Sequence, residues 1–343
     1  MNSVPATLMA SEARESHAAV AHQLAANDAA ITRLAASLRA QPPRFIVTGA
    51  RGSSDHAATF AKYVFETQIG LITASASPSI SSVYAAPQHL EGALFLAISQ
   101  SGRSPDLVHQ AQTARRAGAR VVALVNHADS PLATVAECVI PLHAGAEISV
   151  AATKSYICTL TAVLHLAARW REDAALLDAL FAMPEGLCLS WDLDWSPLVD
   201  GLVGARNLFV IGRGFGFGAA LEAALKFKET CALHAEAFSS AEVRHGPMAL
   251  VGEDFPVLFF CQPDDTRDGT LALAREFRER GAHVLVAAPG ADADPLPVRE
   301  SAHPACTPLL AIQSFYRAAS ALALRRGLDP DVPPHLRKVT ETI

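Results

Sequence analysis

An apolar run that ends in a glycine turn and leads into a helix occurs twice in this chain, at a constant spacing. In the first half the run ends at Gly49, and in the second half it ends at Gly212. These two glycines lie 163 positions apart, and so do Gly118 and Gly281, which each close a later helix. Two landmarks at one offset, with the same order of strands and helices between them, indicate a tandem duplication.

Both halves alternate short apolar strands with helices. The expected strands are Phe45–Thr48, Leu94–Ile98, Val121–Val125, Val139–Leu142, Asn207–Ile211, Pro256–Phe260 and Val284–Ala287. Helices are expected from about Asp55, from Ser104 to Ala117, after Gly214, and from Thr270 to Arg280. Strands that are apolar throughout are typical of parallel sheets covered by helices on both faces. We therefore predict an α/β fold with two tandem doubly wound parallel sheets.

The remaining segments lie before, between and after these two sheets in the sequence. Residues 1–40 are Ala-rich with apolar residues at helical spacing, and they are expected to form N-terminal helices that stop before Pro42. The first domain is expected over residues 41–190 and the second over residues 191–343, with the boundary within Ser190–Val199. A C-terminal tail carries the chain through a proline-rich stretch to Lys338. At 343 residues the chain is long enough for two domains with separate cores.

Charge and composition exclude several classes of protein. A net charge of −6 argues against an electrostatic nucleic-acid partner. No apolar run reaches the length of a membrane span, and Glu12 and Glu15 stand where a signal peptide needs an apolar core. The six cysteines are scattered without a CxxC pair, which is typical of reduced thiols. We expect a cytoplasmic protein with no metal site and no membrane partner.

The stretch with the most titratable residues runs from Leu221 to Pro247. Its first half is expected to be helical, and Glu222, Lys226 and Glu229 stand at i, i+4 and i+7, on one helical face. Carboxylates beside a lysine shift each other's pKa values and suit proton transfer, whereas a solvated ladder of ion pairs is the structural alternative. More titratable residues follow before a Gly-Pro break: His234, Glu236, Glu242 and His245. This density favours a cleft.

Two turns rich in hydroxyl groups follow strands of the first half. One is Ser99–Ser104, and the other is Gly52–Ser54. Because ligands of α/β sheets bind at the carboxyl ends of strands near helix N-termini, these turns predict a phosphate or sugar-phosphate site. The alternative is that the serines only cap helices. A dinucleotide site is not supported, since Phe217 occupies the place of the third glycine in GxGxxG.

These motifs resemble one family over nearly the whole chain, from about residue 8 to the end. They are the tandem layout, SQSGRS after a strand, AGAEISVAATKS at 144–155, the KFKE and HAEAFSSAEVRHGP segments, and the tail with Lys338. Together they are similar to the double sugar-isomerase (SIS) domain proteins. The nearest members are SIS-type glucosamine-6-phosphate deaminases and the isomerase half of glutamine–fructose-6-phosphate aminotransferase, also called glucosamine-6-phosphate synthase. The resemblance implies flavodoxin-like or Rossmann-like domains, no cofactor, and a homodimer with active sites near the subunit interface.

The resemblance also implies a role for individual residues. Glu229 matches the family's enolisation base, His245 its ring-opening histidine, and Lys338 the C-terminal lysine that reaches the sugar carbonyl. Lys226 and Glu222 match the charged residues that support the base. The residues that match the sugar-phosphate pocket are Ser53, Ser54, Ser99, Gln100, Ser101 and Ser104, with Val150 and Ala152 at its wall. Whether His245 acts in its own or in the neighbouring subunit is left open.

Three functions follow from this resemblance. The first is conversion of glucosamine 6-phosphate to fructose 6-phosphate and ammonia, through ring opening and an enolamine. Arg103 and Ser104 favour it, since the synthase carries an acidic residue and a threonine there, and no glutaminase domain is expected ahead of residue 8. The second is an aminotransferase-like isomerase without a glutaminase domain, or a deglycase of a fructosamine phosphate. The third is a non-catalytic regulator that binds sugar phosphate.

Overall fold

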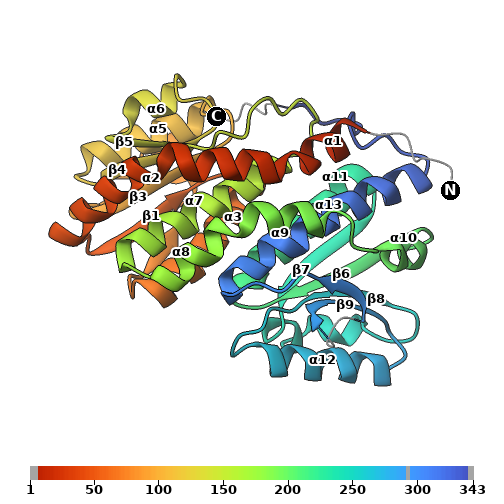
Figure 1. Ribbon diagram of the computed structural model, residues 1–343. Helices are drawn as coiled ribbons and strands as arrows, with labels where there is room; N and C mark the ends of the chain where they lie inside the picture. The colour runs from red at the N-terminus through yellow and green to blue at the C-terminus, as the bar shows by residue number, and fades with distance from the viewer. Residues whose placement is uncertain (1–6, 291–293, 339–343) are drawn as a thin grey trace. The chain divides into compact units, whose positions relative to one another are not determined.

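The computed structural model describes residues 7–290 and 294–338, which contain two separate five-stranded parallel sheets (Figure 1). The chain forms two compact units. Unit A comprises residues 18–147 and 155–181, and unit B comprises residues 7–17, 148–154 and 182–338. The expected segments 1–40 and 191–343 also include residues 1–6, 291–293 and 339–343, which lie outside the described residues.

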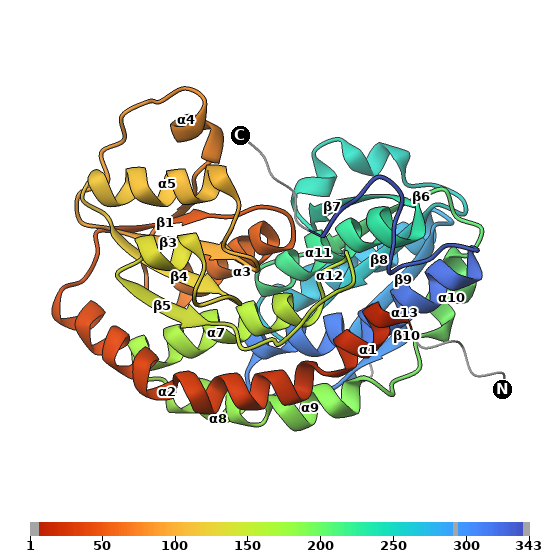
Figure 2. The same cartoon turned by 90° about the horizontal axis from the view of Figure 1, so that it is seen from above.

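Unit A contains the first sheet, in the order β2-β1-β3-β4-β5. Its strands are β1 (Phe45–Gly49), β2 (Thr73–Ser75), β3 (Ala93–Ser99), β4 (Arg120–Val125) and β5 (Cys138–Pro141). Its helices are α2 (Ser16–Ala40), α3 (Ser53–Gln68), α4 (Pro78–Ser82), α5 (Pro105–Arg116), α6 (Pro131–Val135), α7 (Lys154–Arg171) and α8 (Ala174–Phe181). Figure 2 shows α4 and α5 on one face of this sheet and α7 with α2 on the other. Because helices cover both faces, β3 is buried along its whole length.

Unit B contains the second sheet, in the order β10-β9-β8-β6-β7. Its strands are β6 (Asn207–Gly212), β7 (His234–Ser239), β8 (Pro256–Phe260), β9 (His283–Pro289) and β10 (Pro295–Val298). Its helices are α1 (Leu8–Arg14), α9 (Met183–Ser190), α10 (Ser196–Leu202), α11 (Phe215–Cys231), α12 (Arg267–Glu279) and α13 (Thr307–Arg325), with the short 3-10 helices η1 (Glu242–Arg244), η2 (Pro247–Leu250) and η4 (Pro304–Cys306). In Figure 1, α12 lies on one face of the sheet and α11 with α13 on the other.

The two sheets have the same topology, which confirms the predicted duplication. Read from the edge at β7, the second sheet runs β7-β6-β8-β9-β10, so both sheets follow the order 2-1-3-4-5 of a doubly wound fold. Every strand pairing within them is parallel. The order reverses between β1 and β3 in one sheet and between β6 and β8 in the other. Loops that follow these strands are the expected ligand positions of such a fold.

The strand predictions agree with the structure except at three of the four sheet edges. Pro256–Phe260 is observed with the predicted bounds, and the other predicted strands differ by one or two residues at one or both ends. The sequence pattern missed β2, β7 and β10. All three are edge strands, which have only one neighbouring strand to bury them; the fourth edge strand, β5, was predicted. No helix in the described part of the chain is long and apolar enough to cross a membrane.

The repeated glycines have the same backbone role in both units. Gly118 and Gly281 follow α5 and α12 with φ of +87° and +82°. A Cβ atom at Gly118 would lie 3.2 Å from the Cα of Glu91, and one at Gly281 would lie 3.3 Å from the Cα of Glu253. Both a left-handed φ and a close backbone approach therefore require glycine at these helix ends.

We expect Gly281→Ala to lower the free energy of unfolding by about 1–2 kcal/mol, because alanine is strained at this φ. Gly204→Ala is the matched control, since a Cβ atom there meets nothing within 4 Å and φ is not in the left-handed region. Urea unfolding of both variants measures the difference. Equal stability of the two variants would contradict the proposed requirement for glycine at position 281.

Candidate active site

Helix α11 carries the predicted charged face, and both of its sides are packed against protein. It begins after Gly214, ends at Ala232 in the left-handed conformation, and packs against β6, β7 and α13. Alanine, leucine, lysine and glutamate dominate its sequence, as expected of a stable helix. Charged residues on the packed face of such a helix need partners inside unit B.

The structure brings Glu222, Lys226 and Glu229 together as one cluster. The Nζ atom of Lys226 lies 2.6 Å from Oε2 of Glu229 and 3.3 Å from Oε1 of Glu222. Tyr316 of α13 donates its hydroxyl proton to Oε1 of Glu222 over 3.2 Å. Glu222 and Lys226 are buried, whereas the side chain of Glu229 is 20% exposed. The alternative of a solvated ladder is therefore wrong, and Glu229 is the member of the cluster that solvent reaches.

The pKa of Lys226 is raised above the ordinary lysine value of 10.5. Burial alone would lower this pKa, but the charges of Glu222 and Glu229 outweigh burial, with hydrogen bonds to both carboxylates acting in the same direction. Lys226 is consequently an ammonium ion at neutral pH. It can donate a proton or stabilise negative charge, but it cannot accept a proton there, so the role of base is left to a carboxylate.

His245 lies in an exposed turn of unit B. The turn follows β7 and η1, and the backbone N–H of His245 donates to the carbonyl of Glu242 over 2.9 Å. Ser239 shapes the same turn, because its hydroxyl accepts a hydrogen bond from the N–H of Glu242 at 3.1 Å. Within residues 7–290 and 294–338, no hydrogen bond or ion pair joins the His245 imidazole to the α11 cluster. The side chain is thus accessible, and its catalytic role stays a prediction.

The serine turns of unit A lie at the point where the order of the first sheet reverses. One turn follows β1 and the other follows β3, which pairs with β1. Ser99 accepts a hydrogen bond from the N–H of Gly102, and Ser101 accepts one from the N–H of Arg103. These contacts fold the second turn on itself. The turn after β1 reaches the same edge of the sheet, as the parallel pairing predicts.

The alternative that the serines only cap helices does not describe these turns. Ser104 occupies the position before α5, but its side chain makes no capping hydrogen bond, and α3 is preceded by Gly52, not by a serine. In the described part of the chain, the hydroxyl groups of Ser54 and Ser104 and the amide of Gln100 have no protein partner, and all three residues are half-buried. Hydroxyl and amide groups in this state are available to an anion.

An ion pair that the sequence pattern did not indicate connects the two turns. The guanidinium of Arg51, in the turn after β1, donates from Nε and Nη2 to the buried Asp106 in the first turn of α5, at 3.1 and 2.8 Å. The contact fixes the spacing of the two turns. Their separation of 55 positions hides the pair from any short-range motif.

The corresponding loop of unit B already contains its own anion. After β8, the carboxylate of Asp264 accepts hydrogen bonds from the N–H and hydroxyl of Thr266, at 2.8 and 2.6 Å, and from the amide of Gln262 at 2.9 Å. A second anion at this place would meet that carboxylate. Of the two duplicated loops, the serine-rich loop of unit A is therefore the better candidate for phosphate.

The segment 148–154 holds the predicted wall residues and makes contacts with the C-terminal tail. Val150 and Ala152 are both half-buried, and the N–H of Val150 donates to the carbonyl of Asp331 at 3.4 Å. Lys338 donates from Nζ to the carbonyl of Ser149 at 2.8 Å. The lysine of the tail thus contacts the predicted wall segment, within unit B. In the described residues no group of three or more histidine, cysteine or acidic side chains is arranged to hold a metal ion.

Comparison with known proteins gives the family. The SIS domain model matches residues 40–169 and 201–299, so the chain belongs to the SIS domain family. A candidate phosphosugar isomerase from Silicibacter pomeroyi DSS-3 shares 44% of its sequence with this chain, with a TM-score of 0.89 over 95% of this chain and 100% of that one. The glucosamine-6-phosphate deaminase of Thermotoga maritima, at 22% identity, shares the fold, with a TM-score of 0.78 over 98% of this chain and 100% of that one.

Curated relatives point to the same family. The glutamine–fructose-6-phosphate aminotransferase (isomerizing) of Symbiobacterium thermophilum is 34% identical over 315 residues, which are 86% of this chain and 51% of the relative. The chain therefore spans about half the length of the curated relatives that it matches.

We expect Lys226→Met to lower the free energy of unfolding by about 3–5 kcal/mol, because it leaves a buried carboxylate without its cation. Lys228→Met, two positions along the same helix at an exposed site, should change it by less than about 0.5 kcal/mol. The double variant Glu222→Gln/Lys226→Met should recover part of the loss, since it removes the buried charge as well. Urea unfolding at pH 7 measures all three, and equal stability of the two lysine variants would argue for a solvated cluster.

Proposed function

We propose that this chain is a sugar-phosphate isomerase that converts glucosamine 6-phosphate to fructose 6-phosphate and ammonia. The observation that carries the proposal is the position of Glu229, a carboxylate accessible to solvent beside a buried lysine whose pKa is raised by neighbouring carboxylates. Proton transfer between neighbouring carbon atoms needs one base that can take a proton and return it nearby. Glu229 meets that requirement, while Glu222 is buried and accepts a hydrogen bond from Tyr316.

The proposed reaction balances without a cofactor. His245 assists opening of the pyranose ring, and Glu229 takes the proton from C2 of the open-chain amino sugar. Returning that proton to C1 converts the enolamine to the imine of the ketose at C2. Water adds to the imine, the C–N bond breaks, and ammonia leaves with fructose 6-phosphate. The Lys226 ammonium stabilises negative charge during enolisation, and Lys338 acts at the sugar carbonyl, either as a cation or through a transient Schiff base.

The turns of unit A bind the phosphate group in this proposal. The hydroxyl groups of Ser53, Ser54, Ser99, Ser101 and Ser104 and the amide of Gln100 supply neutral hydrogen-bond partners. Backbone N–H groups at the start of α5 add to them. Val150 and Ala152 form the wall beside the sugar. The homodimer implied by the sequence resemblance is part of the same proposal.

Similarity to named proteins supports the choice of substrate class. The 44% identical relative is described as a phosphosugar isomerase, and the curated relatives are aminotransferases that act on fructose 6-phosphate. An amino-sugar phosphate is a substrate that can undergo both an isomerisation and the gain or loss of an amino group. The exposed Arg103 in the phosphate turn fits an anionic substrate.

The proposal is tested by supplying glucosamine 6-phosphate without glutamine and measuring ammonia together with fructose 6-phosphate. Equal release of both products is expected from the purified protein. Tight binding with no release would indicate a regulator that binds sugar phosphate. Release only from a fructosamine phosphate would indicate a deglycase, and either result would contradict the proposed reaction.

Glu229→Gln should lower kcat by about 10²–10⁴-fold, because general acid–base catalysis contributes that range. Binding of the sugar phosphate should persist, as the amide keeps the size of the side chain. Glu185→Gln, at an exposed site on α9, is the matched control and should leave kcat unchanged. Unaltered turnover of Glu229→Gln would rule out its assignment as the base.

Ser104→Ala should weaken binding of glucosamine 6-phosphate by about 10-fold, since a hydrogen bond to a charged group is worth about 1.5 kcal/mol or more. Binding of unphosphorylated glucosamine should not change. Ser77→Ala is the matched control, because Ser77 also precedes a proline at a helix start in unit A and makes no capping hydrogen bond. Calorimetric titration measures each affinity, and an equal loss for both sugars would argue against phosphate binding at Ser104.

A further inference from the structure

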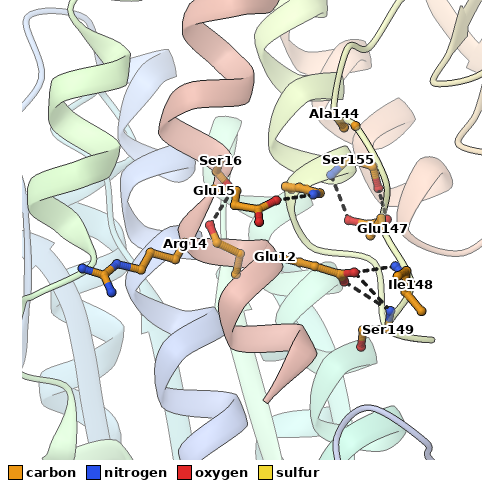
Figure 3. Close-up of polar contacts among 12 residues, drawn as sticks. Glu12, Arg14, Glu15, Ser16, Ala144, Glu147, Ile148, Ser149 and Ser155 are labelled. Atoms are coloured by element: carbon orange, nitrogen blue, oxygen red, sulfur yellow. Dashed lines mark hydrogen bonds and ion pairs between the residues drawn. The ribbon is translucent and has the colours of Figure 1, made fainter. Parts of the chain in front are cut away.

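Ser149 is held at both of its backbone groups by segments from opposite ends of the chain. Its N–H donates to the carboxylate of Glu12 on α1, at 3.2 Å, and the N–H of Ile148 donates to the same carboxylate. Its carbonyl accepts a hydrogen bond from Nζ of Lys338, at 2.8 Å. Figure 3 shows the Glu12 side chain reaching to Ile148 and Ser149. One peptide segment therefore connects an N-terminal carboxylate with the C-terminal lysine.

The C-terminal tail also contacts α1 directly. Both carboxylate oxygens of Asp331 accept hydrogen bonds from the first turn of α1, from the N–H of Leu8 and the N–H of Met9, each at 2.7 Å. The carbonyl of Asp331 accepts the N–H of Val150. A carboxylate at a helix N-terminus satisfies donors that have no partner within the helix. We call the four residues Glu12, Ser149, Asp331 and Lys338 the clasp.

Because both residues are buried, loss of the hydrogen bond between Glu12 and the N–H of Ser149 would be costly. Ser149 is 1% exposed and Glu12 is 6% exposed, so water cannot replace the carboxylate without rearrangement. A carboxylate that accepts two backbone N–H groups also forms stronger hydrogen bonds than a neutral acceptor. Without Glu12, residues 148–149 lose the contact that fixes their N–H groups, and the carbonyl that holds Lys338 is free to turn.

We propose that Glu12 is a positioning residue that sets, through Ser149, where the amine of Lys338 is held and how readily that amine reacts. Glu12 touches no reacting atom in this proposal. The consequence for turnover rests on the proposed function of Lys338, whereas the effect on the amine itself does not. This role extends the catalytic apparatus to α1, which none of the motifs in the second half indicates.

The test is competitive labelling of lysines with acetic anhydride, read by mass spectrometry on the full chain. Of the five lysines, Lys62 and Lys228 are exposed and serve as references, while Lys154 and Lys226 are buried. In the unaltered protein we expect Lys338 to react more slowly than the references, because its amine donates to the carbonyl of Ser149. In Glu12→Ala its rate should rise about 3- to 10-fold, the factor that corresponds to one lost hydrogen bond.

Two further variants keep the test decisive. Glu12→Gln retains one acceptor oxygen and should give a smaller rise, and it replaces Glu12→Ala if that variant does not fold. Arg14→Ala, an exposed change on the same helix, should leave the rate for Lys338 unaltered. Lys154 pairs with Glu15, the residue after α1, and begins α7, so it reports on the whole segment. A rise at Lys338 with Lys154 still protected supports positioning, and a rise at both overturns it in favour of a merely structural role.

Turnover separates this inference from the proposed function. A faster reaction of Lys338 together with a lower kcat and unchanged binding of glucosamine 6-phosphate supports both. A faster reaction of Lys338 in a protein that never releases ammonia supports the positioning by Glu12 and overturns the proposed reaction. An unchanged rate for Lys338 in folded Glu12→Ala or Glu12→Gln overturns the positioning, whatever the turnover.

Discussion

A buried ammonium ion must have negative charge within reach, and this requirement organises unit B around Lys226. Helix α11 is packed between a sheet and α13, so its lysine can be charged only if carboxylates accompany it into the interior. Glu222 supplies one from a fully enclosed position and Glu229 supplies the other from the edge. The interaction that allows α11 to be buried therefore also fixes the orientation of the carboxylate nearest to solvent.

The duplicated halves have the same scaffold, but their loops differ in whether they contain a carboxylate. Gly52 and Gly214 precede α3 and α11 with nearly the same backbone angles, and the strand order is identical. Yet the loop after β3 presents hydroxyl groups, whereas the loop after β8 uses Asp264 to satisfy its own donors. The two duplicated loops lie at similar helix N-termini, but only the loop after β8 places a carboxylate among its own donors.

The sequence predicts the scaffold well because the information is local. Apolar strands, glycine turns and helix starts each depend on a few neighbouring residues, and the α11 cluster follows from helical spacing alone. Burial of that cluster was not predictable from the spacing, because it depends on Tyr316 and α13, about 90 positions away. Arg51 with Asp106, and Glu12 with Ser149, are likewise set by topology. The edge strands β2, β7 and β10 were missed because their apolar pattern is weaker than that of internal strands.

The contact between Leu8 and Asp331 has a consequence for how the chain folds. The two residues are separated by 323 positions, so α1 cannot make this contact until the chain has been synthesised through Asp331. The strands of unit A all lie between residues 45 and 141, whereas unit B combines residues 7–17 with residues 182–338. Contacts between such distant residues are slow to form because closing a long loop costs entropy. Bringing the tail to α1 therefore requires a long loop closure, whereas the hydrogen bonds within the serine turn after β3 join residues two or three positions apart.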